Sequence, residues 1–195
     1  MSLRYEALTG AAIGPVIDGL ADLRIRVFRD WPYLYDGDLT YERGYLAVYR
    51  DNPRAIVAAA FDGDRLVGAA TGLPMVDADP EFRAAFDNTG HDPEQVFYCA
   101  ESVLLPAYRG QGAGHRFFDL REDQARALGL SHAAFCSVQR ASDHPARPEG
   151  YRPLDGFWRK RGYAPVRGVV AQFTWRDIGE DAETAKPLQV WMRPL

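Results

Sequence analysis

Leu104 to His115 reads LLPAYRGQGAGH and joins two segments of different character. The preceding segment, Gln95–Leu105, is rich in β-branched and aromatic residues and predicts a strand. The following segment, Gly112–Leu128, places Phe117 and Leu120 on one face and predicts an amphipathic helix. Its opposite face is predicted to carry the polar side chains of Asp119, Glu122, Asp123 and Arg126. The quoted residues therefore form a turn that leads from a strand into a helix.

Glycines occupy alternate positions in this turn, at residues 110, 112 and 114. They allow a sharp change of chain direction and leave backbone N–H groups uncovered, and the helix that follows adds unpaired amides and the positive end of its dipole. These features predict a site for a phosphate or pyrophosphate, to which Arg109 adds a charged donor. A P-loop would need Lys and then Ser or Thr where this chain has His115-Arg116, and a dinucleotide fingerprint would need glycine at position 115. Neither motif fits.

The remaining pattern intermixes strands and helices. A turn at Asp62-Gly63-Asp64 predicts a hairpin between its two flanking strands. The other predicted strands are Leu3–Ala7, Ala55–Phe61, Arg65–Pro74, Ala133–Val138, Arg167–Arg176 and Pro187–Arg193. The other predicted helices are Ile13–Phe28, Tyr41–Tyr49, Pro80–Asp87 and Leu154–Arg161. This order predicts an α/β or α+β fold with a mixed sheet, in one domain spanning residues 1–195.

The composition excludes several classes of protein. The 195 residues carry a net charge of −4, which gives no global field to hold nucleic acid or an anionic lipid surface. No apolar run reaches the length of a membrane span, and no signal peptide is recognised. Cys99 and Cys136 lie in apolar strand segments without zinc spacing, and the four histidines show no metal spacing. We therefore expect a cytoplasmic protein without a metal.

The glycine loop resembles the coenzyme-A-binding motif of the GNAT N-acetyltransferase superfamily, Arg/Gln-x-x-Gly-x-Gly/Ala. Arg109, Gly112 and Gly114 occupy the three motif positions, and Pro106 and Tyr108 match the usual lead-in. Downstream, FWRKRGY at residues 157–163 resembles the family's second conserved pattern, and the order of elements matches over nearly the whole chain. The alternative is a glycine-rich connection that binds nothing.

The resemblance implies a GNAT-like acyl-CoA acyltransferase fold, with a central mixed, mostly antiparallel sheet flanked by helices. It implies acetyl-CoA as co-substrate, with the pantetheine arm beside the strand and the pyrophosphate on the loop amides. An N–H near Leu104 would polarise the thioester carbonyl, and an amine would attack it directly. The residues implied to bind the cofactor are Ser102, Val103, Leu104, Arg109, Gly110, Gln111, Gly112, Ala113, Gly114 and His115.

Two residues are candidates for proton transfer. Glu101 is the only carboxylate in an otherwise apolar strand, where partial desolvation would raise its pKa toward that of a general base. The alternatives are an exposed edge position or a structural ion pair; the base position of some relatives, on the next strand, is Val138 here. The family's frequent acidic Tyr falls at Trp158, so Tyr151 is the nearest substitute, with a surface-packed loop aromatic as its alternative.

The acceptor side is predicted between the first two helices, in Trp31–Asp38. Tyr33, Tyr35 and Asp36 suit a cationic amine through cation–π contact and charge, although a hydrophobic plug is the alternative. The acidic loop Gly179–Glu183 is a second candidate for the same cleft.

The expected function is therefore an N-acetyltransferase acting on a primary amine of a small molecule or an amino terminus. The alternative, suggested by Trp158, is a non-catalytic acyl-CoA-binding or sensing module. Succinyl-CoA is a further possible donor. The acceptor stays open, and an exposed edge in the last strands allows a homodimer.

Overall fold

The computed structural model describes residues 3–87 and 89–195. The strands are β1 (Arg4–Leu8), β2 (Ile56–Asp62), β3 (Arg65–Pro74), β4 (Val96–Tyr98), β5 (Ser102–Leu104), β6 (His132–Val138), β7 (Ala164–Trp175) and β8 (Thr184–Pro194). The helices are α1 (Ile17–Phe28), α2 (Leu39–Asp51), α3 (Pro80–Ala84), α4 (Ala113–Ala127) and α5 (Asp155–Lys160). Short 3₁₀ turns cover Gly10–Val16, Met75–Asp77, Pro93–Gln95 and Pro106–Tyr108.

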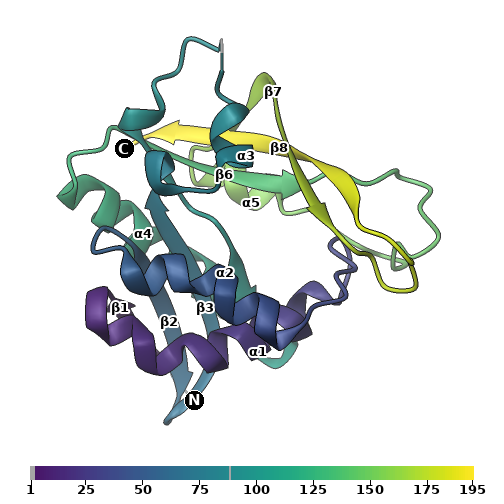
Figure 1. Cartoon of the computed structure of the whole chain (residues 1–195), viewed down its shortest axis with the longest axis horizontal. Helices are drawn as coiled ribbons and strands as arrows, with labels where there is room; N and C mark the ends of the chain where they lie inside the picture. The colour runs from purple at the N-terminus through teal and green to yellow at the C-terminus, as the bar shows by residue number, and fades with distance from the viewer. Residues whose placement is uncertain (1–2, 88) are drawn as a thin grey trace.

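Within the described residues, the strands form one eight-stranded sheet in the order β1-β2-β3-β4-β6-β8-β7, with β5 also paired to β3. The β4–β6 pair is parallel, and the other described pairs are antiparallel. In Figure 1, β2 and β3 run up the molecule while β6 and β8 cross its top. The predicted class, a mixed and mostly antiparallel sheet flanked by helices, is confirmed.

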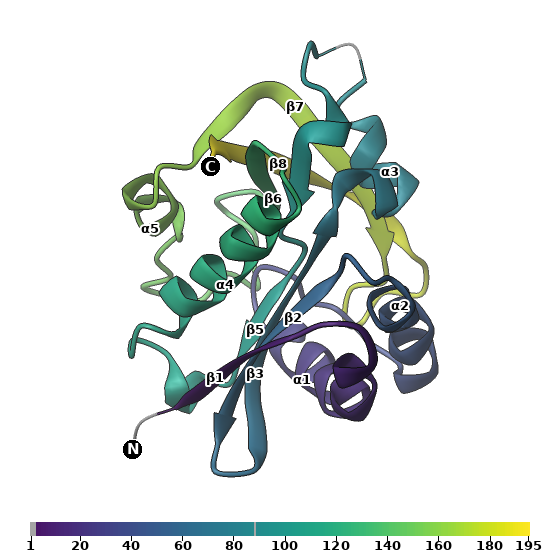
Figure 2. The ribbon, with the colours of Figure 1, turned by 90° about the vertical axis from the view of Figure 1, so that its left-hand side faces the viewer.

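Helices cover both faces of β1–β3. Figure 2 shows α4 on one side of these strands and α1 and α2 on the other. Strand β2 reads IVAAAFD, and its first five residues are buried. A strand covered on both faces loses the alternation of polar and apolar residues, and the small alanines let the helices approach closely. From α4, Phe117 packs on Ala58, Ala60 and Ala70.

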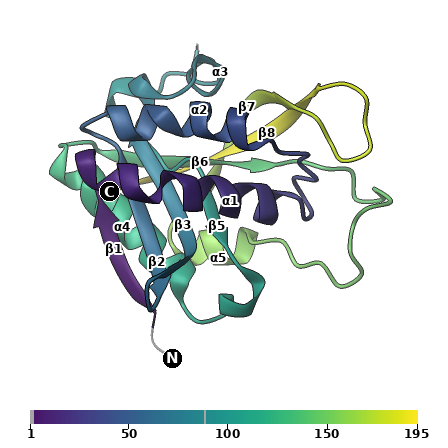
Figure 3. The ribbon, with the colours of Figure 1, turned by 60° about the horizontal axis from the view of Figure 1, so that its bottom comes forward.

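The predicted strand Gln95–Leu105 is interrupted, which corrects that prediction. Leu73 pairs with Tyr98 and Ala70 pairs with Ser102, so two residues of β3 face three residues of the other strand. This is a β-bulge, which bends the strand and separates β4 from β5. Beyond it, β5 follows β3 while β6 crosses toward β8 (Figure 3).

Two helical predictions also need correction. The predicted helix Ile13–Phe28 begins as an α-helix only at Ile17, because Pro15 lacks an N–H and keeps the preceding turn 3₁₀. Glu122, predicted on the polar face of α4, is buried, because Arg161 and Tyr163, in the turn between α5 and β7, supply partners for its carboxylate. No helix in the described part of the chain is long and apolar enough to cross a membrane.

Candidate active site

The glycine loop forms an open group of amides at the start of α4. Gly110 and Gly112 have φ angles of 77° and 86°, in the left-handed region that favours glycine. Within the described residues, the backbone amides from Gly110 to Gly114 have no hydrogen-bond partner, whereas the His115 amide bonds to the Gly112 carbonyl. Arg109 is exposed beside them. The loop therefore presents consecutive donors and the positive end of a 15-residue helix to an anion.

One edge of β5 is also free. The Thr71 amide donates to the Glu101 carbonyl at 3.0 Å, and the Leu105 amide donates to the Val67 carbonyl at 3.0 Å. Because N–H and C=O of a planar trans peptide point in opposite directions, the Ser102 N–H and the Leu104 C=O point away from β3. The Leu104 carbonyl accepts a hydrogen bond from Arg109 Nε at 3.2 Å. No described strand pairs with that edge, since β6 bonds to β4 and β8. The gap between β5 and β6 thus offers strand-like donors and acceptors to an extended ligand.

Arg121 of α4 supports the bulge from the face of the sheet that α4 covers, and it is 1% exposed. Its guanidinium donates to the carbonyls of Thr71 at 3.2 Å and Glu101 at 3.1 Å, and to Ser102 Oγ at 3.0 Å. No carboxylate pairs with it among the described residues. The prediction from sequence missed Arg121, although an arginine four residues after the buried Phe117 lies on the apolar face of the helix.

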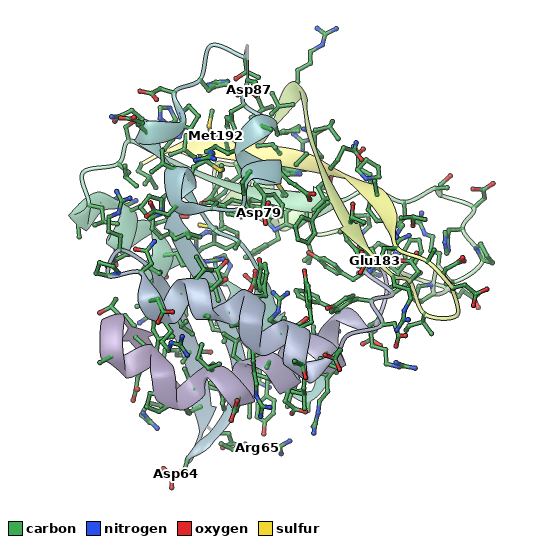
Figure 4. All side chains as sticks on the ribbon, in the orientation of Figure 1. Asp64, Arg65, Asp79, Asp87, Glu183 and Met192 are labelled. Carbon is green, nitrogen blue, oxygen red and sulfur yellow. The ribbon has the colours of Figure 1, made fainter. Side chains whose placement is uncertain are left out.

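A cavity of about 350 Å³ lies at the side chains of the bulge, between α1, α2 and β7. Its side chains are mostly aromatic or acidic, and Glu183 stands at the β7–β8 turn beside the α1–α2 connection (Figure 4). The lining residues include Arg24, Phe28, Tyr33, Tyr35, Asp36, Asp38, Tyr41, Tyr45, Phe82, Tyr98, Ala100, Glu101, Cys136, Phe173, Trp175, Arg176, Asp181, Glu183 and Leu188. This volume is in the range of small-molecule sites.

Three residues predicted for the acceptor, Tyr33, Tyr35 and Asp36, all line this cavity. Their segment is joined to the end of β7, because the Asp36 amide donates to the Arg176 carbonyl and Tyr35 forms a bridge with Asp177. The Gly179–Glu183 loop also reaches this cavity, as predicted, through Asp181 and Glu183.

Arg140 fixes this wall of the cavity. It donates to the carbonyls of Pro32 at 2.9 Å and Tyr33 at 2.7 Å and forms a two-pronged pair with Asp177. Burial works against the charged form of Asp177, but the hydrogen bonds and charges of Arg140 and Lys186 hold its pKa below the usual value. Loops 31–36, 139–153 and 176–183 are therefore joined by one partly buried ionic cluster.

Glu101 connects the gap and the cavity. The Glu101 carbonyl belongs to the bulge, and the Glu101 carboxylate lies in the cavity. The residue as a whole is 7% exposed. Arg24 Nη1 is 2.5 Å from Glu101 Oε1, and the same guanidinium also pairs with Glu42. The Tyr45 hydroxyl lies 3.4 Å from Glu101 Oε2. Glu101 is thus buried and in an ion pair, one of its predicted alternatives, while its role as a base stays a prediction.

The sequence model of the acetyltransferase (GNAT) family matches residues 19–152. The chain belongs to the GNAT acetyltransferase family. A comparison with curated proteins gave no match.

Solved structures agree with this family at the level of the fold. A GCN5-related N-acetyltransferase from Kribbella flavida is similar with a TM-score of 0.59 and 18% identity, covering 99% of this chain and 98% of that one. A protein from Salmonella typhimurium assigned as an acetyltransferase, solved with acetyl-CoA, has a TM-score of 0.59 and 12% identity, covering 100% of this chain and 95% of that one. An aminoglycoside 6′-N-acetyltransferase complexed with coenzyme A has a TM-score of 0.58 and 18% identity, covering 97% and 96%.

Trp158, which the sequence analysis placed at the position of the family's frequent tyrosine, is partly buried against the core. Trp158 packs on Phe135 and Trp191, with ring centroids 4.9 and 5.2 Å apart. Tyr151, the predicted substitute, does not line the cavity; its ring lies edge-on to Trp31 at 6.0 Å, beside Arg147. The structure therefore does not bring Tyr151 to Glu101.

The phenol nearest to Glu101 among the described contacts is Tyr45, which the prediction missed. The spacing of Tyr41, Tyr45 and Tyr49 along α2, four residues apart, was the available signal. Burial, followed by the charge of Glu101, raises the pKa of Tyr45 well above its ordinary value, so the hydroxyl keeps its proton.

The structure also places Cys136 and His115, two residues that the sequence analysis considered. Cys136 lines the cavity but is buried, and burial raises the pKa of its thiol to about 12, so it is not a thiolate nucleophile at neutral pH. His115 contacts Arg161 and the ring of Phe157. Among the described residues, no three His, Cys, Asp or Glu side chains come together as a metal site.

Proposed function

We propose that this protein transfers an acetyl group from acetyl-CoA to a primary amine held in the aromatic cavity. The observation that carries the proposal is the position of Glu101. Its backbone lies at the bulge where the free edge of β5 begins, and its side chain lies in the cavity. A thioester in the gap and an amine in the cavity would then meet at one residue.

The glycine loop supports binding of the cofactor's pyrophosphate. The backbone amides from Gly110 to Gly114 have no hydrogen-bond partner among the described residues, and the exposed Arg109 adds a positive charge. We assign the pantetheine arm to the outer edge of Ser102, Val103 and Leu104, where no described strand pairs with β5 and an extended chain could pair instead, displacing Arg109 from the Leu104 carbonyl. Gln111, Ala113 and His115 complete the loop.

In the proposed reaction the amine nitrogen attacks the acetyl carbonyl, a C–N bond forms, and the C–S bond to coenzyme A breaks. The outward N–H groups of β5 support stabilisation of the oxyanion at this carbonyl. The attacking amine must lose a proton, and Glu101 is the carboxylate positioned to accept it. Tyr45 would orient that carboxylate through its hydroxyl.

The leaving thiolate must gain a proton. Tyr151 is the donor proposed from the sequence, but its position outside the cavity favours water or another phenol. Tyr45 is the phenol that the geometry favours, because its O–H lies beside Glu101.

A second candidate function is a non-catalytic acyl-CoA sensor. It is favoured by Trp158 at the tyrosine position and by the pairing of Glu101 with Arg24. Thermal unfolding with and without acetyl-CoA tests the cofactor site, which both functions require, and stabilisation by the ligand is expected. Release of free coenzyme A thiol with a panel of amines then separates them: acceptor-dependent release supports the transferase, and binding without release across the panel supports the sensor.

A further inference from the structure

The charges of the cavity are divided unequally between paired and unpaired groups. Its two guanidiniums are both engaged: Arg24 by Glu42 and Glu101, and Arg176 by Asp36 at 2.7 Å. Each lining cation is therefore already paired with a carboxylate of the protein.

The carboxylates outnumber these cations. Asp38 is the N-cap residue of α2, and its carboxylate accepts hydrogen bonds from the backbone amides of Thr40 and Tyr41. Asp181 and Glu183 are exposed at the β7–β8 turn, and within the described residues neither side chain makes an ion pair or a hydrogen bond. Figure 4 places Glu183 at the β7–β8 turn, near the α1–α2 connection. Both carboxylates are free to attract a positively charged ligand.

The rest of the wall is aromatic and uncharged. Nine of the lining residues are Phe, Tyr or Trp, drawn from α1, the α1–α2 connection, α2, α3, β4 and β7. Burial raises the pKa values of Tyr33, Tyr35, Tyr45 and Tyr98, so these rings stay neutral at physiological pH. Neutral rings offer apolar contact to a hydrophobic body and π faces to an ammonium group.

We propose that the acceptor is a primary amine carried on an apolar, aromatic-sized body that bears no anionic group. This inference rests on the proposed transferase function and names the substrate class of the same cavity. The ammonium group would lie toward Glu101, the body against the aromatic wall, and the unpaired carboxylates at the mouth would favour cations on approach.

An amine that also carries a carboxylate is expected to be rejected. Its anion would be desolvated among aromatic rings and carboxylates, and it would have to compete with Glu101 or Asp36 for a lining arginine, which costs binding free energy. Free amino acids and phosphorylated amines therefore fall outside the class.

The test compares two matched pairs of acceptors, tyramine with tyrosine and tryptamine with tryptophan, which differ only in the carboxylate. Thiol release from acetyl-CoA is measured for each, and we expect kcat/KM to be at least about tenfold higher for the decarboxylated amine in both pairs. Equal or faster turnover of the amino acids would overturn the inference.

Titration calorimetry of the same amines, with coenzyme A present, separates this inference from the proposed function. If tyramine binds more tightly than tyrosine but neither is acetylated, the cavity has the proposed selectivity and the transferase function fails. If neither amine binds, or tyrosine binds as well, the inference itself is wrong.

The role of the two unpaired carboxylates, Asp181 and Glu183, is tested by the double variant Asp181→Asn/Glu183→Gln. Glu180→Gln is the control, because Glu180 lies in the same loop but does not line the cavity. We expect the double variant to raise KM for tyramine severalfold and to leave acetyl-CoA affinity unchanged, with the control equal to wild type. An unchanged KM in the double variant would contradict the assignment of these two carboxylates.

Discussion

Arg121 Nη1 lies 3.1 Å from the carbonyl oxygen of Glu101, so a buried guanidinium from α4 supports the bulge from below the sheet. The same group reaches the Thr71 carbonyl, the β3 residue that faces the bulge. The Glu101 carbonyl sets the direction of the Ser102 N–H, since both belong to one planar peptide. Arg121 thereby connects helix packing to the backbone edge proposed for the thioester.

The first prediction concerns this support. Arg121→Met removes hydrogen bonds to several buried oxygens, and we expect the free energy of unfolding to fall by about 2–4 kcal/mol. The change is measured by urea unfolding. Arg126→Met on the same helix is the control, because its side chain is 46% exposed and a change within about 0.5 kcal/mol is expected. Equal losses in the two variants would show that Arg121 does not hold the bulge.

The second prediction concerns the loop glycines. Gly112→Ala places a side chain on a residue with φ of 86°, which costs about 1–2 kcal/mol, and it partly covers the free amides. We expect lower stability and weaker binding of acetyl-CoA by calorimetry. Gly44→Ala, inside α2 with no atom near its added Cβ, should instead stabilise by about 0.5–1 kcal/mol and leave binding unchanged. Unchanged affinity in Gly112→Ala would argue against the loop as the pyrophosphate site.

The glycine loop could be predicted from sequence because its determinants are local. Positive φ at Gly110 and Gly112 and the following helix are encoded within a few residues of the motif. The bulge could not be predicted, because the register of Ala100 and Glu101 depends on residues that are distant in sequence. These are Thr71 of β3 and Arg121 of α4. An apolar strand looks continuous until its partner is known.

The cavity was only partly predictable for the same reason. Tyr33, Tyr35 and Asp36 could be proposed from an aromatic and acidic segment, but the bridge of Tyr35 with Asp177 joins residues distant in sequence.

The burial of Glu122 could not be predicted either, because helical periodicity alone assigns this residue to a polar face. Its burial depends on Arg161 and on Tyr163, whose hydroxyl donates to its carboxylate at 3.0 Å.

The third prediction concerns the cluster around Asp177. The pKa of Asp177 in the folded protein lies below its ordinary value, so the stabilisation from the charged carboxylate is complete above the pKa of the unfolded chain and fades as the pH falls through the folded-state pKa. Asp177→Asn should therefore lower the unfolding free energy by about 1–3 kcal/mol at pH 7 and reduce the loss of stability in acid. Unfolding curves from pH 7 to pH 3 measure both effects. Asp123→Asn is the control, because the Asp123 side chain is 73% exposed. If the stability of Asp177→Asn fell with pH in parallel with wild type, the stabilising role of the Asp177 carboxylate would be contradicted.

The fourth prediction compares two tyrosines. Tyr45→Phe removes the hydroxyl beside Glu101, and we expect kcat with the best amine to fall about tenfold or more. Tyr151→Phe alters a ring outside the cavity, and kcat should stay within about twofold of wild type. Steady-state thiol release measures both variants. The reverse order would restore Tyr151 as the proton donor proposed from the sequence.

Glu101 carries the most direct test of the transferase proposal. Acetyl transfer to tyramine is followed in single turnovers for wild type and Glu101→Gln, with acetyl-CoA affinity measured separately by calorimetry. We expect Glu101→Gln to bind acetyl-CoA like wild type and to transfer the acetyl group about 100-fold more slowly, because proton removal from the amine is lost. Transfer at the wild-type rate by Glu101→Gln would contradict the assignment of Glu101 as the base where cofactor and amine meet.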